Sequence, residues 1–237
     1  MLHLGVSQVA LGSIIWILIY RRMGGTYEEN LERFWELLKE AYIEDGVQCR
    51  FSFFNASMFH DPARPKSVYP RLKGRGMEVK HVVAPILKIF QRFAHGRPPA
   101  ARDADDVLIL DILRQLVFIQ HTFDAHSTAY LLPRADTDKV LAACDKFLAG
   151  YARLHNRAKA NGDLLWHTIP KCHTFWHMCD RAKYAHPRLG NCCLDEDWVG
   201  KVKRIVVASA AGTALHRIPN KVMSKMRWVK SLLHSCD

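Results

Sequence analysis

The stretch TYEENLERFWELLKEAYIEDG, residues 26–46, decides the fold class because every local signal in it agrees. Thr26 and Glu29 have the spacing of a capping box, in which each side chain bonds the backbone N–H of the other residue. Apolar residues then recur at intervals of three and four, which places them on one face of a helix, and Gly46 is a typical stop. We predict an amphipathic helix whose apolar face holds Leu31, Phe34, Trp35, Leu38 and Tyr42.

The same signals recur along the rest of the chain. Residues 77–95, about 106–126 and 133–162 each carry apolar side chains at helical spacing, and the last two stretches begin with Asp residues, which favour the positive end of a helix. The alternation of apolar and polar residues that is typical of strands is almost absent. We therefore predict an all-α fold, a single globular domain of about seven helices joined by long loops.

The N-terminus carries an apolar run over residues 9–20, interrupted only by Gly12 and Ser13. A helix that spans a membrane needs about 20 apolar residues, and a signal peptide needs positive charge before its apolar region. Because the run fits neither, we predict that residues 1–25 form an apolar helix buried in a protein core. A membrane anchor over residues 4–20 is the alternative.

Length and composition are those of a globular protein. The chain has 237 residues, of which 49% are hydrophobic, so it can bury a sizeable core. We expect one helical domain over residues 1–237, made of the buried helix of residues 1–25, a helical region at 26–165 and a C-terminal region at 166–237. Its seven cysteines show no regular framework of spacings, so we expect an intracellular, reducing location and no essential disulfide.

Basic residues are in excess and lie in two bands. Lys and Arg outnumber Asp and Glu by 34 to 23, a net charge of +11 that favours anionic partners, nucleic acid before a membrane surface. The first basic band, residues 64–102, has ten Lys or Arg and the single acid Glu78; the second, residues 201–230, has no acid. No motif indicates a small-molecule substrate. The candidate contacts to DNA or RNA are Lys73, Arg75, Lys80, Lys201, Lys203, Arg204, Lys221 and Lys225.

Residues 169–204 concentrate Cys, His and acidic residues, which raises the question of a metal site. Pro170 is well suited to begin a helix, on which His173 and His177 share a face while Cys179 points elsewhere. The acid of a His-Glu-x-x-His metalloprotease motif is missing, and the cysteine spacings do not match paired zinc ligands. We therefore predict packed helix residues and no metal site.

Three adjacent carboxylates, Asp195, Glu196 and Asp197, precede the last basic stretch. They suit the start of a helix, where Asp195 would cap and the other two would face the positive end of the helix dipole. The functional alternative is that Glu196 or Asp197 is a metal-binding carboxylate of a phosphoryl-transfer site, which holds Mg2+ through several acids. One carboxylate alone is not sufficient for that chemistry.

Three motifs in this region carry a resemblance to known proteins. They are Pro-Lys-x-His at residues 170–173, His-Pro-Arg at 186–188 and Asp-Glu-Asp-x-x-Gly followed by basic residues at 195–204. Together with the order of the preceding segments, they resemble the C-terminal region of large mobile-element-type proteins of dinoflagellates. More distantly, the pattern is similar to the end of CACTA-type transposases.

The transposase resemblance implies particular roles for parts of this chain. In those enzymes a helical region precedes the last acidic residue of a DDE triad in an RNase H-like core, so residues 26–165 would be largely that insertion. Glu196 or Asp197 would be the third carboxylate, and Mg2+ the only cofactor. The strands with the first two Asp are absent from this sequence, so we expect a truncated, nuclear mobile-element protein without a complete catalytic site. Nucleic-acid binding would be its residual activity; the alternative is a structural or interaction protein with an N-terminal membrane anchor.

Overall fold

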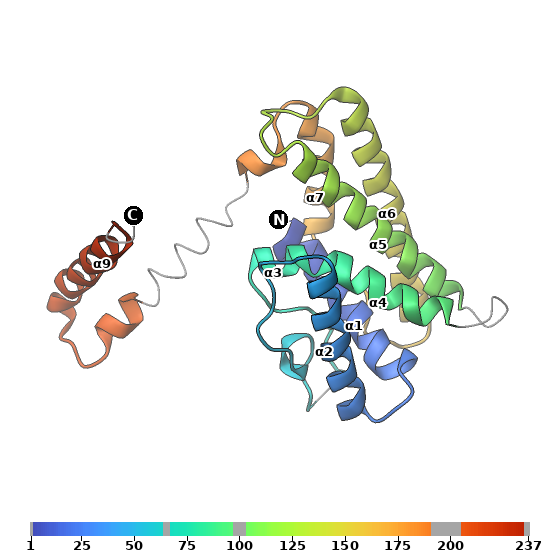
Figure 1. Ribbon diagram of the computed structural model, residues 1–237, viewed down its shortest axis with the longest axis horizontal. Coiled ribbons are helices and arrows are strands. Elements are labelled where there is room, and N and C mark those ends of the chain that lie inside the picture. The colour runs from blue at the N-terminus through green and yellow to red at the C-terminus, as the bar shows by residue number, and fades with distance from the viewer. Residues whose placement is uncertain (1, 64–66, 97–102, 191–204, 235–237) are drawn as a thin grey trace. The chain divides into compact units, whose positions relative to one another are not determined.

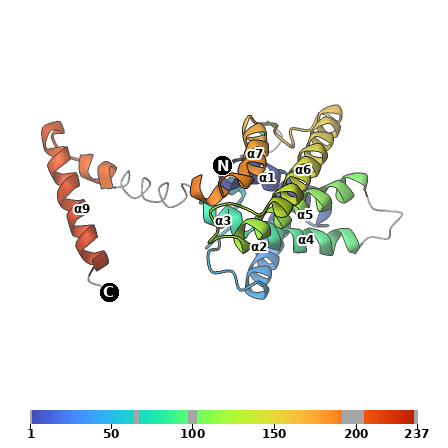
Figure 2. The same cartoon turned by 90° about the horizontal axis from the view of Figure 1, so that it is seen from above.

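The computed structural model describes residues 2–63, 67–96, 103–190 and 205–234 (Figures 1 and 2). All regular secondary structure in these ranges is helical, and none of their residues is in a strand, which confirms the predicted all-α class. The chain divides into two compact units, unit 1 at Met1–Gly190 and unit 2 at Asn191–Asp237. From the sequence we expected one domain, with no boundary between residues 190 and 191.

Unit 1 contains most of the helices. Its longer ones are α1 (Gln8–Ile17), α2 (Tyr27–Glu44), α3 (Gly76–His81), α4 (Val83–His95), α5 (Ala104–Ala125), α6 (Arg134–Ala160) and α7 (Lys171–Asp180). π-helical turns η1 (Leu2–Ser7) and η2 (Leu18–Arg22) flank α1, and short 3₁₀ turns are η3 (Ala56–Met58), η5 (Arg181–Lys183) and η6 (Pro187–Gly190). Unit 2 contains a helical segment at residues 205–210, the 3₁₀ turn η7 (Leu215–Arg217) and α9 (Ile218–His234).

The apolar run of the N-terminus lies in the core of unit 1 as α1. All ten of its residues are buried, and the nine other than Gly12 are between 0% and 6% exposed, including the polar ones. Those polar side chains bond distant segments: Ser13 Oγ accepts the backbone N–H of Trp166 at 2.9 Å, and Gln8 Oε1 accepts from the Arg71 guanidinium at 2.7 Å. Within the described part of the chain, no helix has both the length and the apolar character needed to cross a membrane.

Helix α2 begins with the predicted capping box. The Thr26 hydroxyl accepts the backbone N–H of Glu29 at 3.3 Å, and the Glu29 carboxylate accepts that of Thr26 at 2.9 Å. These bonds to Thr26 lower the pKa of Glu29. The buried Asn30 side chain donates to the carbonyls of Ile19 at 2.8 Å and Met23 at 3.1 Å, and so fixes α2 to the end of η2.

The remaining helices of unit 1 pack in sequence order, α4 on α5, α5 on α6 and α6 on α7 (Figure 1). Helix α5 starts at its N-cap Asp103, whose carboxylate accepts the Asp105 backbone N–H at 3.0 Å. The predicted helix over residues 77–95 is divided at Val82 into α3 and α4, with Pro85 in the first turn of α4, where a missing N–H does little harm.

An aromatic cluster lies at the C-terminal end of α1 and in η2. The rings of Trp16 and Tyr20 stack with centroids 4.8 Å apart, and those of Tyr20 and Tyr27 with centroids 5.0 Å apart. The Tyr20 hydroxyl is hydrogen-bonded to Nε2 of His60 at 2.8 Å. His60 is only 5% exposed, and its burial lowers its pKa below the ordinary 6.5.

We expect this buried imidazole to make unit 1 less stable in mild acid. Because the pKa of His60 is lower in the folded than in the unfolded chain, the unfolded chain binds a proton first, and the free energy of unfolding falls as the pH drops below about 6.5. The slope from one such group is at most about 1.4 kcal/mol per pH unit. Urea denaturation of the wild type and of His60→Gln at about pH 7.5 and about pH 5.5 measures it. The variant should lose less stability between the two pH values, and equal losses would contradict the expectation.

Candidate nucleic-acid interface

The structure describes part of the predicted site. Lys73, Arg75 and Lys80 lie in unit 1, and Lys221 and Lys225 lie in unit 2. The remaining predicted residues lie outside the described ranges. They are the candidate catalytic residues Glu196 and Asp197 and the candidate contacts Lys201, Lys203 and Arg204.

Carboxylates from other segments pair with three of the basic residues of the first basic band that the structure describes. Lys80 Nζ of α3 lies 2.5 Å from Asp124 Oδ1 of α5. Lys88 of α4 pairs with Asp45 beyond the end of α2, and Arg92 lies 2.9 Å from Glu44 Oε1. Lys80, Lys88 and Arg92 therefore add less positive potential to the folded surface than the sequence suggests.

The positive charges of two predicted contacts in the first basic band, Lys73 and Arg75, are less compensated by nearby carboxylates. Lys73 Nζ donates to the backbone carbonyl of Ser57 at 2.7 Å, a neutral acceptor. The Arg75 side chain is 70% exposed, with its Nε 3.9 Å from the Glu78 carboxylate, at the start of α3. An exposed pair at this separation is weak. Lys73 and Arg75 thus remain available to an anion, and Lys80 is already occupied by Asp124.

Unit 2 has a different electrostatic character. Between residues 205 and 234 the sequence has no Asp or Glu. Lys221 and Lys225, one turn apart on α9, donate to neutral acceptors in the preceding segment: Lys221 Nζ to the Thr213 hydroxyl at 2.7 Å, and Lys225 Nζ to the Ala208 carbonyl at 3.3 Å. These bonds hold the ammonium groups in place, and no carboxylate of the described residues forms an ion pair with either of them. We name this pair, with the exposed Arg217 four residues before Lys221, the unit-2 cationic face.

The turn that precedes α9 depends on a glycine. Gly212 has a φ of +64°, in the left-handed region that L side chains rarely adopt. It ends the helical segment of residues 205–210 and allows the chain to return toward η7, which brings Thr213 and Ala208 within reach of the two lysines. The geometry of the unit-2 cationic face therefore depends on a turn as well as on the helix.

The His and Cys residues of α7 face different ways, as their spacing predicts. His173 Nε2 and His177 Nε2 lie 3.0 Å apart on the outer side, and Cys179 is fully buried. A hydrogen bond with the Cys144 thiol and then burial raise the pKa of Cys179, so it stays a protonated core residue. Among the described residues no group of three or more His, Cys, Asp or Glu is placed to hold a metal ion.

No protein-family model, curated protein or solved structure matches this chain in the three comparisons. The resemblance to mobile-element proteins and to CACTA-type transposases therefore stays a prediction from the sequence. The structure itself defines the class: an all-α protein with a core unit and, in its described C-terminal part, an acid-free cationic helical segment.

Proposed function

We propose that the protein binds nucleic acid through the phosphate backbone and that the unit-2 cationic face makes the main contact. The observation that carries this proposal is that Lys221 and Lys225 donate only to neutral groups in the bonds described, within a segment that has no acid. A phosphate oxygen can accept further N–H bonds from each ammonium, which has three donors. Binding of this kind carries no base recognition, so we expect little sequence specificity.

The resemblance supports the same activity. Transposases act on nucleic acid, and the basic helical surface of this chain suits such a partner. A metal-binding role for Glu196 or Asp197 needs the other carboxylates of a DDE site, and binding through the unit-2 cationic face does not depend on it. We therefore expect Glu196→Gln to bind nucleic acid as the wild type does.

Fluorescence anisotropy with labelled duplex DNA, single-stranded DNA and RNA tests the proposal. We expect the double variant Lys221→Gln/Lys225→Gln to bind about tenfold more weakly, and the slope of log K against log[salt] to become shallower by about two, one for each lost phosphate contact.

The matched control is Lys88→Gln/Arg92→Gln, which removes the same charge from residues that already pair with carboxylates of unit 1. We expect this control to bind within about twofold of the wild type. If both double variants lost the same affinity for nucleic acid, net charge alone would explain the effect, and the unit-2 cationic face would be rejected as the contact surface. Wild-type affinity in the Lys221 and Lys225 variant would reject it as well.

A further inference from the structure

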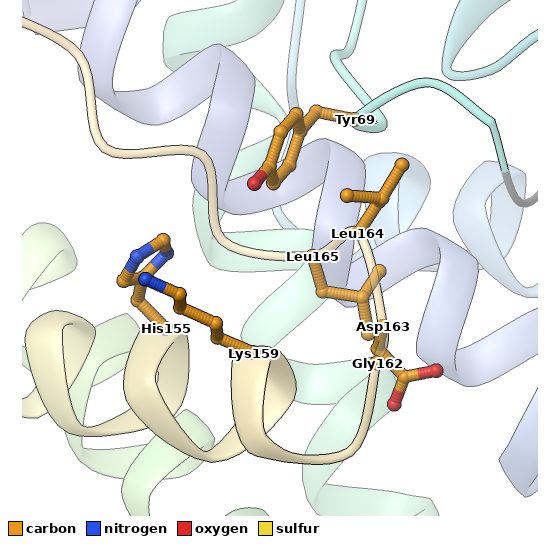
Figure 3. Close-up of a pocket in the computed structure, with 7 residues that line it drawn as sticks. All are labelled: Tyr69, His155, Lys159, Gly162, Asp163, Leu164 and Leu165. Atoms are coloured by element: carbon orange, nitrogen blue, oxygen red, sulfur yellow. The ribbon is translucent and has the colours of Figure 1, made fainter.

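Unit 1 contains a pocket that no sequence motif indicates. It has a volume of about 360 Å3 and lies between the loop that carries Tyr69 and the C-terminal end of α6 with the loop that follows (Figure 3). This volume is within the range of pockets that hold small molecules. The lining residues are Tyr69, His155, Lys159, Gly162, Asp163, Leu164 and Leu165.

The polar groups of the pocket suit an anion. His155 and Lys159 are one turn apart on α6, so their side chains share a face and reach the same space (Figure 3). Nδ1 of His155 is 2.9 Å from the carbonyl oxygen of Trp166. A carbonyl only accepts, so Nδ1 carries the proton and Nε2 is left for a ligand. Lys159 is exposed, and no carboxylate of the described chain forms an ion pair with it.

The one acidic residue of the pocket is already compensated. Asp163 Oδ1 lies 2.6 Å from the Arg21 guanidinium, which also lies over the Trp16 ring with its carbon 4.9 Å from the centroid. Figure 3 shows the Asp163 carboxylate turned away from Lys159 and Tyr69. Arg21, Asp163 and Lys159 together therefore leave one positive charge, and Lys159 places it in the pocket.

Contacts with buried residues of unit 1 hold the segments that line the pocket in place. Trp166, which follows the lining loop, has a φ of +59°, a strained conformation for a bulky residue. Its backbone N–H donates to Ser13 Oγ at 2.9 Å, and its ring, 2% exposed, meets the Tyr151 ring edge-on. The Tyr69 ring stacks on His167 with centroids 4.4 Å apart. A backbone held in a strained conformation by several independent contacts is typical of a preformed binding site.

We propose that this pocket binds a small phosphate monoester of about the size of a mononucleotide. The phosphate accepts hydrogen bonds from the Lys159 ammonium and the Tyr69 hydroxyl. His155 Nε2, which carries no proton, accepts a hydrogen bond from a protonated phosphate oxygen. The rest of the ligand lies against Leu164 and Leu165, which supply the apolar wall. This site is separate from the unit-2 cationic face, and neither proposal depends on the other.

Isothermal titration calorimetry of the full chain with adenosine 5′-monophosphate tests the proposal. We expect saturable binding by the wild type, weaker binding of inorganic phosphate because it lacks the part that meets the leucines, and no detectable binding of adenosine. In parallel, NMR should show the ring proton signals of His155 shifting as the monophosphate is added.

Two matched variants separate the pocket from general charge effects. Lys159→Gln should weaken monophosphate binding at least about tenfold, and Lys146→Gln, which removes an exposed lysine of the same helix outside the pocket, should leave it within about twofold. No saturable binding by the wild type, equal losses in both variants, or adenosine binding as well as the monophosphate would each overturn the proposal. The Lys221→Gln/Lys225→Gln variant should bind the monophosphate normally, so failure here is distinguishable from failure of the nucleic-acid proposal.

Discussion

Gly12→Val should lower the free energy of unfolding of unit 1 by about 3 kcal/mol or more, the upper range of overpacking a core. A Cβ at Gly12 would lie 2.6 Å from Cα and N of Arg71 and 2.7 Å from the carbonyl carbon of Pro70. These are backbone atoms, which cannot turn away as the end of a flexible side chain can. Their position is fixed because the Arg71 N–H donates to the Phe59 carbonyl at 2.7 Å and the Leu72 N–H donates to the Gln8 carbonyl at 2.9 Å.

Urea denaturation followed by circular dichroism and tryptophan fluorescence measures the effect. Gly24→Val is the matched control, because a Cβ at Gly24 meets nothing within 4 Å and its φ is not in the left-handed region. We expect the control to stay within about 1 kcal/mol of the wild type. If Gly12→Val were as stable as Gly24→Val, the close approach of residues 70–72 to α1 would not exist in solution.

Arg22→Met should cost about 3 to 5 kcal/mol, the range for breaking a buried ion pair from one side. Arg22 Nε donates to Asp106 Oδ1 at 2.8 Å, and the Asp106 side chain is only 2% exposed. Arg22 also lies 3.1 Å from Oδ2 of Asp103, the N-cap of α5. The Asp105 N–H and then Arg22 lower the pKa of Asp103. Methionine keeps the length of the stem and removes the positive charge that faces these carboxylates.

Two further variants test this explanation by the same urea titration. Lys39→Met breaks an exposed pair with Glu36 and should change the free energy of unfolding by no more than about 0.5 kcal/mol. The double variant Arg22→Met/Asp106→Leu should recover part of the loss, because an apolar pair replaces a buried carboxylate that has lost its arginine. An Arg22→Met cost no larger than that of Lys39→Met would refute the role of this pair.

The helices of this protein were predictable because their signals are local. The capping box at Thr26 and Glu29 is formed, and α7 begins directly after Pro170. Residues 9–19 of the apolar run are buried in the core of unit 1, and Tyr20 is partly buried against it. Asn30 was missed because its signal is tertiary: a polar residue on the buried face of α2 is explained only by the carbonyls of Ile19 and Met23.

The candidate site was predictable only in part. Net charge and the absence of acid between Trp198 and Asp237 indicate the unit-2 cationic face without any structure. The first basic band appeared equally strong, yet Lys80, Lys88 and Arg92 face carboxylates that lie more than 40 residues away in the chain. A count of charges within a window does not include such partners.

By itself, therefore, the sequence determined the all-α class, the capped start of α2 and the basic excess, because helix periodicity, capping and charge act between neighbours in the chain. Only the tertiary structure decided which lysines pair with carboxylates, why a side chain does not fit at Gly12 and where a pocket forms. Those properties depend on atoms that meet across long separations, as Ser13 meets Trp166 over 153 positions. Such contacts arise from the packing of whole helices, and no local pattern records them.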